Sequence, residues 1–365
     1  MDDRTRFRKT CRFERVDRLA IRHVGHWPET MTAWENQGLD PDDVVKIHGN
    51  DPCRGVGVPL GSAYWSPFWP RFEREFIEET DEYVVECDEN GRTKRWKKDG
   101  RPELAQYLRF PVETRDDWNR LKWRLDPDND DRYQKLPELA KTAGGINGRD
   151  YPMEQIMCGP YRMLWLMFGD MGIAYAIADA PDLVHEVLQT WLSLVKSSLE
   201  RIFSYIDIDS VSMLEDICYR QGLMLSPSAF RRFLLPYYQG LTSFLDNYPS
   251  VVCRSVDSDG YVGGLIPLLL EGGVNTLLPF EVQAGNDVLA TRKKWGRRLI
   301  IRGGINKLEI AKGRTAIDAE LNRVLPTFTD TGGYFICLDH SAHPDIALED
   351  YRYYVERVRT WPRKQ

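Results

Sequence analysis

The sequence predicts an α/β protein, a (β/α)8 TIM barrel with an antiparallel β-rich insertion in the N-terminal third. From Gly145 onward, short β-rich runs alternate with helical segments, as parallel strands joined by helical crossovers require. So many units in one chain favour a closed barrel over an open sheet. No G-x-G-x-x-G motif follows any of the runs, which weakens a dinucleotide-binding fold. We therefore expect one barrel domain over residues 1–365, with 52–133 as the insertion.

The first strand and helix are expected near the N-terminus, and the insertion follows them. A β-rich run at 19–25 leads through a loop into an amphipathic helix at 31–37, which a glycine ends. The segment 52–133 then changes pattern, because glycines, turn residues and an aromatic cluster that includes Trp65 replace the earlier alternation. Asn90-Gly91 stands between two alternating runs and predicts a β-hairpin.

The remaining elements are expected in order along the rest of the chain. Strands are predicted at 156–160, 209–216, 251–260, 276–281, 299–305 and 333–340. Helices are predicted at 181–203, after the Ser226-Pro227 cap, at 262–271 and at about 348–361.

Composition excludes several classes of protein. With 42% apolar and 12% aromatic residues, the chain can bury a large core. The net charge of -6 and the shortness of every Lys/Arg run argue against a nucleic-acid surface. No stretch of about 18 apolar residues and no apolar leader occurs, so we expect a cytoplasmic protein without a membrane partner. The seven cysteines are scattered and form no C-x-x-C, which indicates neither a disulfide framework nor a zinc ribbon.

The run at 251–260 carries the strongest functional pattern. It ends in Asp257 and Asp259, which alternation along a strand would place on one face, at the strand end where barrel enzymes keep their active sites. Two carboxylates that close are unfavourable unless a cation or a shared proton lies between them. We therefore expect a bound cation. The alternative is an interior salt-bridge network in which these aspartates pair with Arg22, Arg254 or Arg302.

Other polar residues at predicted strand ends are candidates for catalysis and for substrate binding. The catalytic candidates are Glu215, Asp216 and His26. The candidates for binding a small-molecule substrate are Arg22, His23, Glu281, Arg302, Asn306 and Trp65. Asp216 has helix capping as its structural alternative, and Trp65 has the core of the insertion.

Several motifs together resemble the uroporphyrinogen decarboxylase superfamily. They are Leu225-Ser-Pro-Ser-Ala-Phe230, Leu278-Pro-Phe-Glu281, Ile301-Arg-Gly-Gly-Ile-Asn306 and Cys337-Leu-Asp-His340. The resemblance runs from about Gly145 to Arg359 and implies a (β/α)8 barrel and a homodimer. This superfamily contains both the tetrapyrrole decarboxylase and methyltransferases that work with corrinoid proteins.

Two departures from the family patterns bear on function. The decarboxylase has an arginine-rich loop near its N-terminus, and the matching stretch here is Arg22-His-Val-Gly-His-Trp-Pro-Glu29. The methyltransferases hold zinc with His-x-Cys-Gly and a further cysteine, whereas the matching positions here are Asp257-Ser-Asp-Gly260 and His340. The resemblance therefore implies a metal site made of Asp257, Asp259 and His340.

Two carboxylates and an imidazole suit Zn²⁺ with an open position, or Mn²⁺, Fe²⁺ or Mg²⁺, and such a metal acts as a Lewis acid on a substrate oxygen. We expect an O-demethylase type of methyltransferase, which passes a methyl group from a small methoxylated or methylated compound to a corrinoid on a partner protein. A decarboxylase acting on a carboxylated ring compound and a binding barrel without catalysis are the alternatives.

Overall fold

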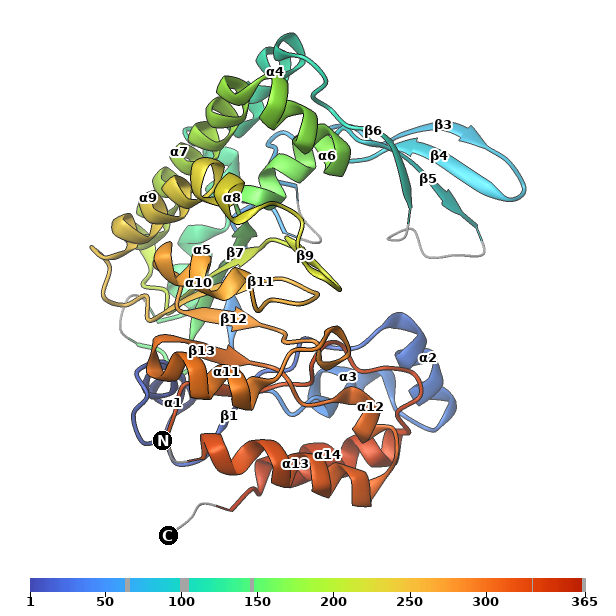
Figure 1. Cartoon of the computed structure of the whole chain (residues 1–365), viewed down its shortest axis with the longest axis vertical. Coiled ribbons are helices and arrows are strands. Elements are labelled where there is room, and N and C mark those ends of the chain that lie inside the picture. The colour runs from blue at the N-terminus through green and yellow to red at the C-terminus, as the bar shows by residue number, and fades with distance from the viewer. Residues whose placement is uncertain (63–65, 99–104, 145–147, 330, 363–365) are drawn as a thin grey trace.

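An eight-stranded parallel sheet forms the centre of the molecule (Figure 1). The computed structural model describes residues 1–62, 66–98, 105–144, 148–329 and 331–362. In chain order the strands are β1 (Ala20–Ile21), β2 (Arg54–Gly55), β7 (Met153–Cys158), β8 (Ser210–Leu214), β11 (Cys253–Asp257), β12 (Thr276–Leu278), β13 (Ile300–Arg302) and β14 (Tyr334–Ile336). Each strand pairs with the next one from β2 to β14, and β14 pairs with β1, which is the neighbour order of a (β/α)8 barrel.

Isolated hydrogen bonds from the residues before β2, rather than a ladder, join it to β1. Within the described ranges no paired register joins these two short strands. Instead Asp51 donates its backbone N–H to the Ile21 carbonyl at 3.0 Å, and its carboxylate accepts the Ile21 N–H at 3.2 Å. Asp51 therefore links the two edges of the curled sheet.

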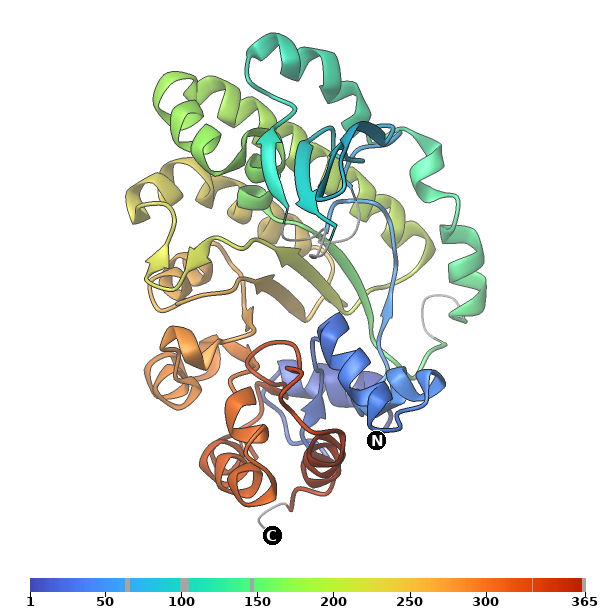
Figure 2. The same cartoon turned by 90° about the vertical axis from the view of Figure 1, so that its right-hand side faces the viewer.

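Helices cover the outside of the sheet (Figures 1 and 2). They are α1 (Asp3–Cys11), α2 (Pro28–Asn36), α3 (Val44–Ile47), α4 (Arg115–Leu121), α5 (Leu136–Thr142), α6 (Pro160–Asp179), α7 (Pro181–Tyr205), α8 (Pro227–Phe233), α9 (Leu235–Leu245), α10 (Leu265–Glu271), α11 (Val288–Trp295), α12 (Lys307–Ile310), α13 (Arg314–Phe328) and α14 (Leu348–Arg359). Short 3-10 segments lie at Pro41–Asp43, Lys122–Leu125, Asp130–Tyr133, Val282–Ala284 and Gly296–Arg298. No described helix alone has the length and hydropathy to cross a membrane; α6 and α7 pass that test only as a pair, bent by 117°.

The predicted antiparallel insertion is present, and it is shorter than the sequence suggested. Its four-stranded sheet consists of β3 (Glu75–Glu79), β4 (Tyr83–Cys87), β5 (Thr93–Lys97) and β6 (Gln106–Arg109). Within the predicted range 52–133, β2 belongs to the barrel, because Arg54 and Gly55 pair with the start of β7. A two-residue strand that contains glycine gives no alternation to detect. Trp65 lies outside the described residues.

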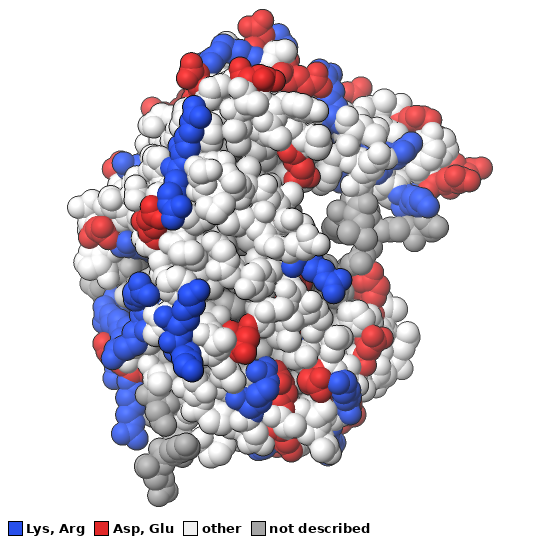
Figure 3. All heavy atoms as spheres, in the orientation of Figure 1, with Lys and Arg blue, Asp and Glu red and all other residues white. Residues whose placement is uncertain are grey.

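The barrel has a closed bottom and a mouth formed by the loops after the strands. At the bottom, α1 packs against the strands in an apolar cluster. Its members are Phe7 and Cys11 of the helix and Ala20, Cys253, Ile300 and Phe335 of the strands. At the mouth, the β3–β6 sheet and α2 lie on opposite sides of the opening (Figure 2). Between these strands and α2 the surface is hollowed, and basic and acidic side chains are interspersed around it (Figure 3). A short antiparallel pair, β9 (Cys218–Tyr219) and β10 (Gly222–Leu223), adds to the rim.

Candidate metal centre

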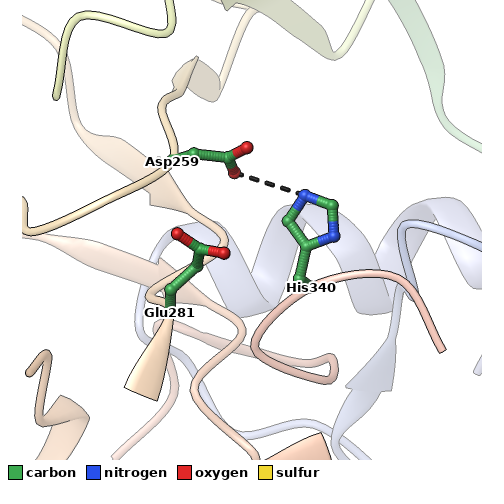
Figure 4. Close-up of side chains that lie close together, drawn as sticks. All are labelled: Asp259, Glu281 and His340. Atoms are coloured by element: carbon green, nitrogen blue, oxygen red, sulfur yellow. Dashed lines mark ion pairs between the residues drawn. The ribbon is translucent and has the colours of Figure 1, made fainter. Parts of the chain in front are cut away.

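Three acidic or imidazole side chains meet at the mouth of the barrel (Figure 4). Asp259 follows β11, Glu281 follows β12 and His340 follows β14. One ligand atom from each lies within 4.8 Å of the other two, and Asp259 Oδ1 is 3.4 Å from His340 Nε2. These residues are separated by up to 81 positions in sequence, and parallel strand ends bring them to one place. We call this group the rim triad.

Backbone contacts fix Glu281 against the loop that carries Asp259. The Gly260 N–H donates to Glu281 Oε2 at 2.8 Å, so the residue after Asp259 holds the carboxylate of Glu281 in place. Gly260 has φ +79°, and a Cβ on it would lie 2.6 Å from the Tyr219 carbonyl oxygen. Only glycine fits this turn, because L side chains rarely adopt that φ and the space is filled.

Asp339 joins the loops that carry the other ligands. Its buried carboxylate accepts the Val282 N–H on one oxygen and the Lys307 N–H on the other, both at 3.0 Å. The first bond holds the loop directly after Glu281, and Asp339 itself precedes His340. The His340 ring also stacks on Trp27, with centroids 5.2 Å apart and planes 15° apart. Neighbouring residues therefore hold the triad in place against the repulsion between its two carboxylates.

The charges at the rim act on His340. Burial alone would lower the pKa of this imidazole, but the hydrogen bond and charge of Asp259 and the charge of Glu281 outweigh burial and raise the pKa. The cationic form of His340 is thus stabilised by the same two carboxylates that would share a bound cation with it.

Asp257 lies beside the rim triad and outside it. Asp257 was predicted to be a metal ligand and Glu281 a substrate contact, whereas the structure brings Glu281 to Asp259 and His340. Burial, followed by the charges of Asp216 and Asp259, raises the pKa of Asp257 to about 7. Within the described residues its carboxylate has no hydrogen bond or ion pair to a side chain.

The three arginines of the predicted salt-bridge alternative have partners other than Asp257 and Asp259. Arg254 pairs with Asp246 at 2.6 Å, and Arg22 pairs with Glu154 at 2.8 Å. Arg302 donates its Nε–H to the Arg22 carbonyl at 2.8 Å. Among the residues that the structure describes, none of the three pairs with Asp257 or Asp259, so arginines do not satisfy the oxygens of these aspartates.

The consecutive acids Glu215 and Asp216 have different surroundings. Glu215 is fully buried at the start of α6, where its Oε2 accepts the Arg162 N–H at 2.8 Å and Oε1 accepts the Tyr238 hydroxyl proton. Burial raises the pKa of Glu215 to about 8, although the Tyr238 bond opposes this. Asp216 has φ 51° and is 39% exposed at the mouth, 3.3 Å from the Arg162 guanidinium. Helix capping, proposed for Asp216, is thus the role of Glu215.

The two histidines near β1 contact helices instead of the rim triad. His26 Nδ1 is 2.7 Å from His48 Nε2, and His48 Nδ1 is 2.7 Å from the Tyr351 hydroxyl. His23 is 5% exposed and lies against Tyr351 and Tyr354 of α14. The ring of His23 therefore faces away from the barrel interior.

Among the remaining predicted residues, Asn306 caps α12 through a bond from the Leu308 N–H at 3.0 Å and also accepts from Gln283. Trp27 and Arg162 were not predicted from the sequence, because an aromatic residue in a loop and an arginine in a helix carry no spacing pattern.

A cavity of about 420 Å³ adjoins the rim triad. Its lining consists of Cys218, Tyr219, Arg220, Asp259, Gly260, Glu281, Gln283 and Ala284. A larger cavity of about 980 Å³ lies against α1 and contains no member of the triad.

Comparisons with known proteins agree with this architecture. The profile of the uroporphyrinogen decarboxylase (URO-D) family matches residues 83–361. Uroporphyrinogen decarboxylase of Trichlorobacter lovleyi is 23% identical over 146 residues, and this match covers 38% of each protein. A methyltransferase from Methanosarcina mazei has the same fold, with a TM-score of 0.59, 15% identity and 98% of each chain covered. Since the family profile matches most of the chain, the protein belongs to the uroporphyrinogen decarboxylase family.

Proposed function

We propose that this protein is a metal-dependent methyltransferase that takes a methyl group from a small methoxylated or methylated compound and passes it to a corrinoid on a partner protein. The rim triad is the observation that carries the proposal. The full-length likeness to a methyltransferase fold is consistent with it. A homodimer in the cytoplasm remains part of the proposal.

The donor set fits a divalent cation. Carboxylate oxygens and an imidazole nitrogen bind Zn²⁺ or Mn²⁺ at about 2.1 Å, which puts ligand atoms of a tetrahedral site about 3.4 Å apart. The 3.4 Å between Asp259 and His340 agrees with that spacing. Three protein ligands would leave a position for substrate. A cation held there would polarise an ether or alcohol oxygen of the substrate as a Lewis acid.

The chain's own carboxyl groups have the properties of proton donors. When the methyl group leaves as a formal cation, the C–O bond electrons stay on the substrate oxygen, which must then take up a proton. Asp257 borders the triad, and its pKa of about 7 lets its carboxyl hold a proton near neutral pH. Asp216 has a raised pKa as well, caused first by burial. The carboxyl of Asp257 can therefore supply the proton that the oxygen requires.

Metal content tests the proposal. Protein purified without chelator is expected to carry close to one equivalent of a transition metal, and Asp259→Asn and His340→Gln should each weaken metal binding at least about tenfold. His343→Gln is the matched control, because His343 and Asp345 form a comparable pair 3.0 Å apart at a more exposed position. Less than about 0.2 equivalents, with no gain on adding Zn²⁺ or Mn²⁺, would refute the metal site.

Decarboxylation of a carboxylated ring compound is the second candidate, and the match to the Trichlorobacter lovleyi enzyme favours it. The two candidates differ in products and in metal dependence. Methyl transfer from a methoxylated compound to free cob(I)alamin, lost after Asp259→Asn, supports the first. Release of CO2 from a carboxylated ring compound, unchanged by a chelator, supports the second.

A further inference from the structure

Arg302 lies inside the barrel, below the rim triad. Ile301 pairs with Leu277 and Asp257 pairs with Leu278, so Arg302 stands in the same row of the sheet as Asp257, two strands away. Neighbouring strands are about 4.8 Å apart, which separates the two backbones by about 10 Å. Both side chains point inward, because Ile300, two residues before Arg302, belongs to the interior cluster at the barrel bottom.

The guanidinium of Arg302 has no carboxylate partner in the described part of the chain. Its contacts are the Arg22 carbonyl, at 2.8 Å, and the thiol of Cys337. The nearby Glu154 is already paired with Arg22 at 2.8 Å. Among these three side chains, two arginines and one glutamate leave one positive charge in excess, and the charge of Arg302 acts on Asp257 without an ion pair between them. An unpaired arginine inside a protein is unfavourable unless an anion from outside completes it.

The inward face of the sheet is open to solvent at β7. Ile156 is in the middle of β7, on the inward face that it shares with Glu154, yet it is 39% exposed. Ser212 pairs with Ile156 across the sheet, and Ser255 pairs with Ser212, so hydroxyl groups line the next two strands. An apolar side chain, two hydroxyl groups and a guanidinium without a carboxylate partner on the inward face suit a small amphiphilic anion.

We propose that the substrate is a small monocarboxylate whose carboxylate binds Arg302, with its other end directed to the rim triad. The guanidinium favours a planar group with two oxygens, because two parallel N–H bonds can form. With the carboxylates of Asp259 and Glu281 above it at the mouth, the single positive charge of Arg302 selects against anions with several charges. The statement that the other end of the substrate reacts at the rim triad rests on the proposed function, whereas the carboxylate contact with Arg302 does not.

The test uses metal-free protein, so it is independent of catalysis. Titration calorimetry with benzoate, acetate and formate should give a dissociation constant below about 10 mM for at least one of them, and benzamide, the neutral analogue of benzoate, should bind more weakly. Arg302→Met should weaken carboxylate binding at least about tenfold, and Arg302→Lys should lose less. Arg254→Met is the matched control, because Arg254 faces outward on β11 and pairs with Asp246.

Two results would overturn the proposal. One is no binding of any of the three carboxylates, or equal binding of benzoate and benzamide, by wild type. The other is unchanged carboxylate affinity in a folded Arg302→Met variant, which would make Arg302 a structural counter-charge for Asp257. Asp259→Asn separates this proposal from the metal site: it should remove the metal and leave carboxylate binding intact.

Discussion

Replacing Glu215 by glutamine should change how stability depends on pH. The Glu215 carboxyl is fully buried and its pKa is raised from 4.5 to about 8, first by burial. In the unfolded chain it ionises near 4.5, so between the two pKa values the folded state binds more protons, and stability falls as pH rises. Each pKa unit is about 1.4 kcal/mol, so wild type should lose up to about 4 kcal/mol relative to Glu215→Gln between about pH 5 and pH 8.

Urea unfolding of both proteins at several pH values measures this difference, and taking the difference cancels the titration of other groups. Glutamine can still accept the Arg162 N–H with its oxygen and donate to the Tyr238 hydroxyl with its amide. The control is Glu186→Gln, since the hydrogen bond from Lys122 lowers the pKa of Glu186 and leaves it ionised in both states above about pH 6. The prediction is wrong if the difference in the free energy of unfolding between wild type and Glu215→Gln does not depend on pH. It is also wrong if wild type gains stability relative to the variant as the pH rises.

Two further predictions concern stability. Gly303→Ala should destabilise at least about 2 kcal/mol more than Gly25→Ala, because both glycines have φ near +120° but only a Cβ at Gly303 would strike the Pro279 carbonyl oxygen, at 1.8 Å. Equal losses on urea unfolding would exclude this clash. Asp209→Asn should cost about 3–5 kcal/mol, since the buried carboxylate forms ion pairs with three arginines, whereas Asp130→Asn at an exposed ion pair should cost under about 1 kcal/mol. Similar losses in these two variants would contradict the expected effect of burial.

The sequence predicted those features that depend on short stretches of chain. The Ser226-Pro227 cap is present at α8, where the Ser226 hydroxyl accepts the Ala229 N–H at 3.1 Å. The hairpin at Asn90-Gly91 joins β4 and β5 as expected. Both features follow from local backbone preferences, and so does the alternation that turns Asp257 inward.

Positions beyond the strand ends could not be predicted in the same way. Alternation stops where β11 ends at Asp257, and Asp259 is placed by its loop. Glu281 reaches the rim triad through the Gly260 N–H, a contact between two loops that no spacing in the sequence indicates. At Asp216 the left-handed φ of 51° breaks the alternation, so Glu215 and Asp216 face a helix and the mouth respectively.

The interior of the barrel is ordered by charge from bottom to mouth, and this order connects fold and function. The apolar cluster with α1 fills the bottom, so the loops after the strands are at the open end of the barrel. Above it, the Arg22–Glu154 pair is neutral and Arg302 adds one positive charge. At the mouth, acids outnumber His340, which disfavours any bare anion there unless a cation is bound first. A carboxylate therefore crosses the mouth more slowly when the rim triad holds no cation, but its affinity is set below the mouth by Arg302, so a bound cation should change the rate of association more than the dissociation constant.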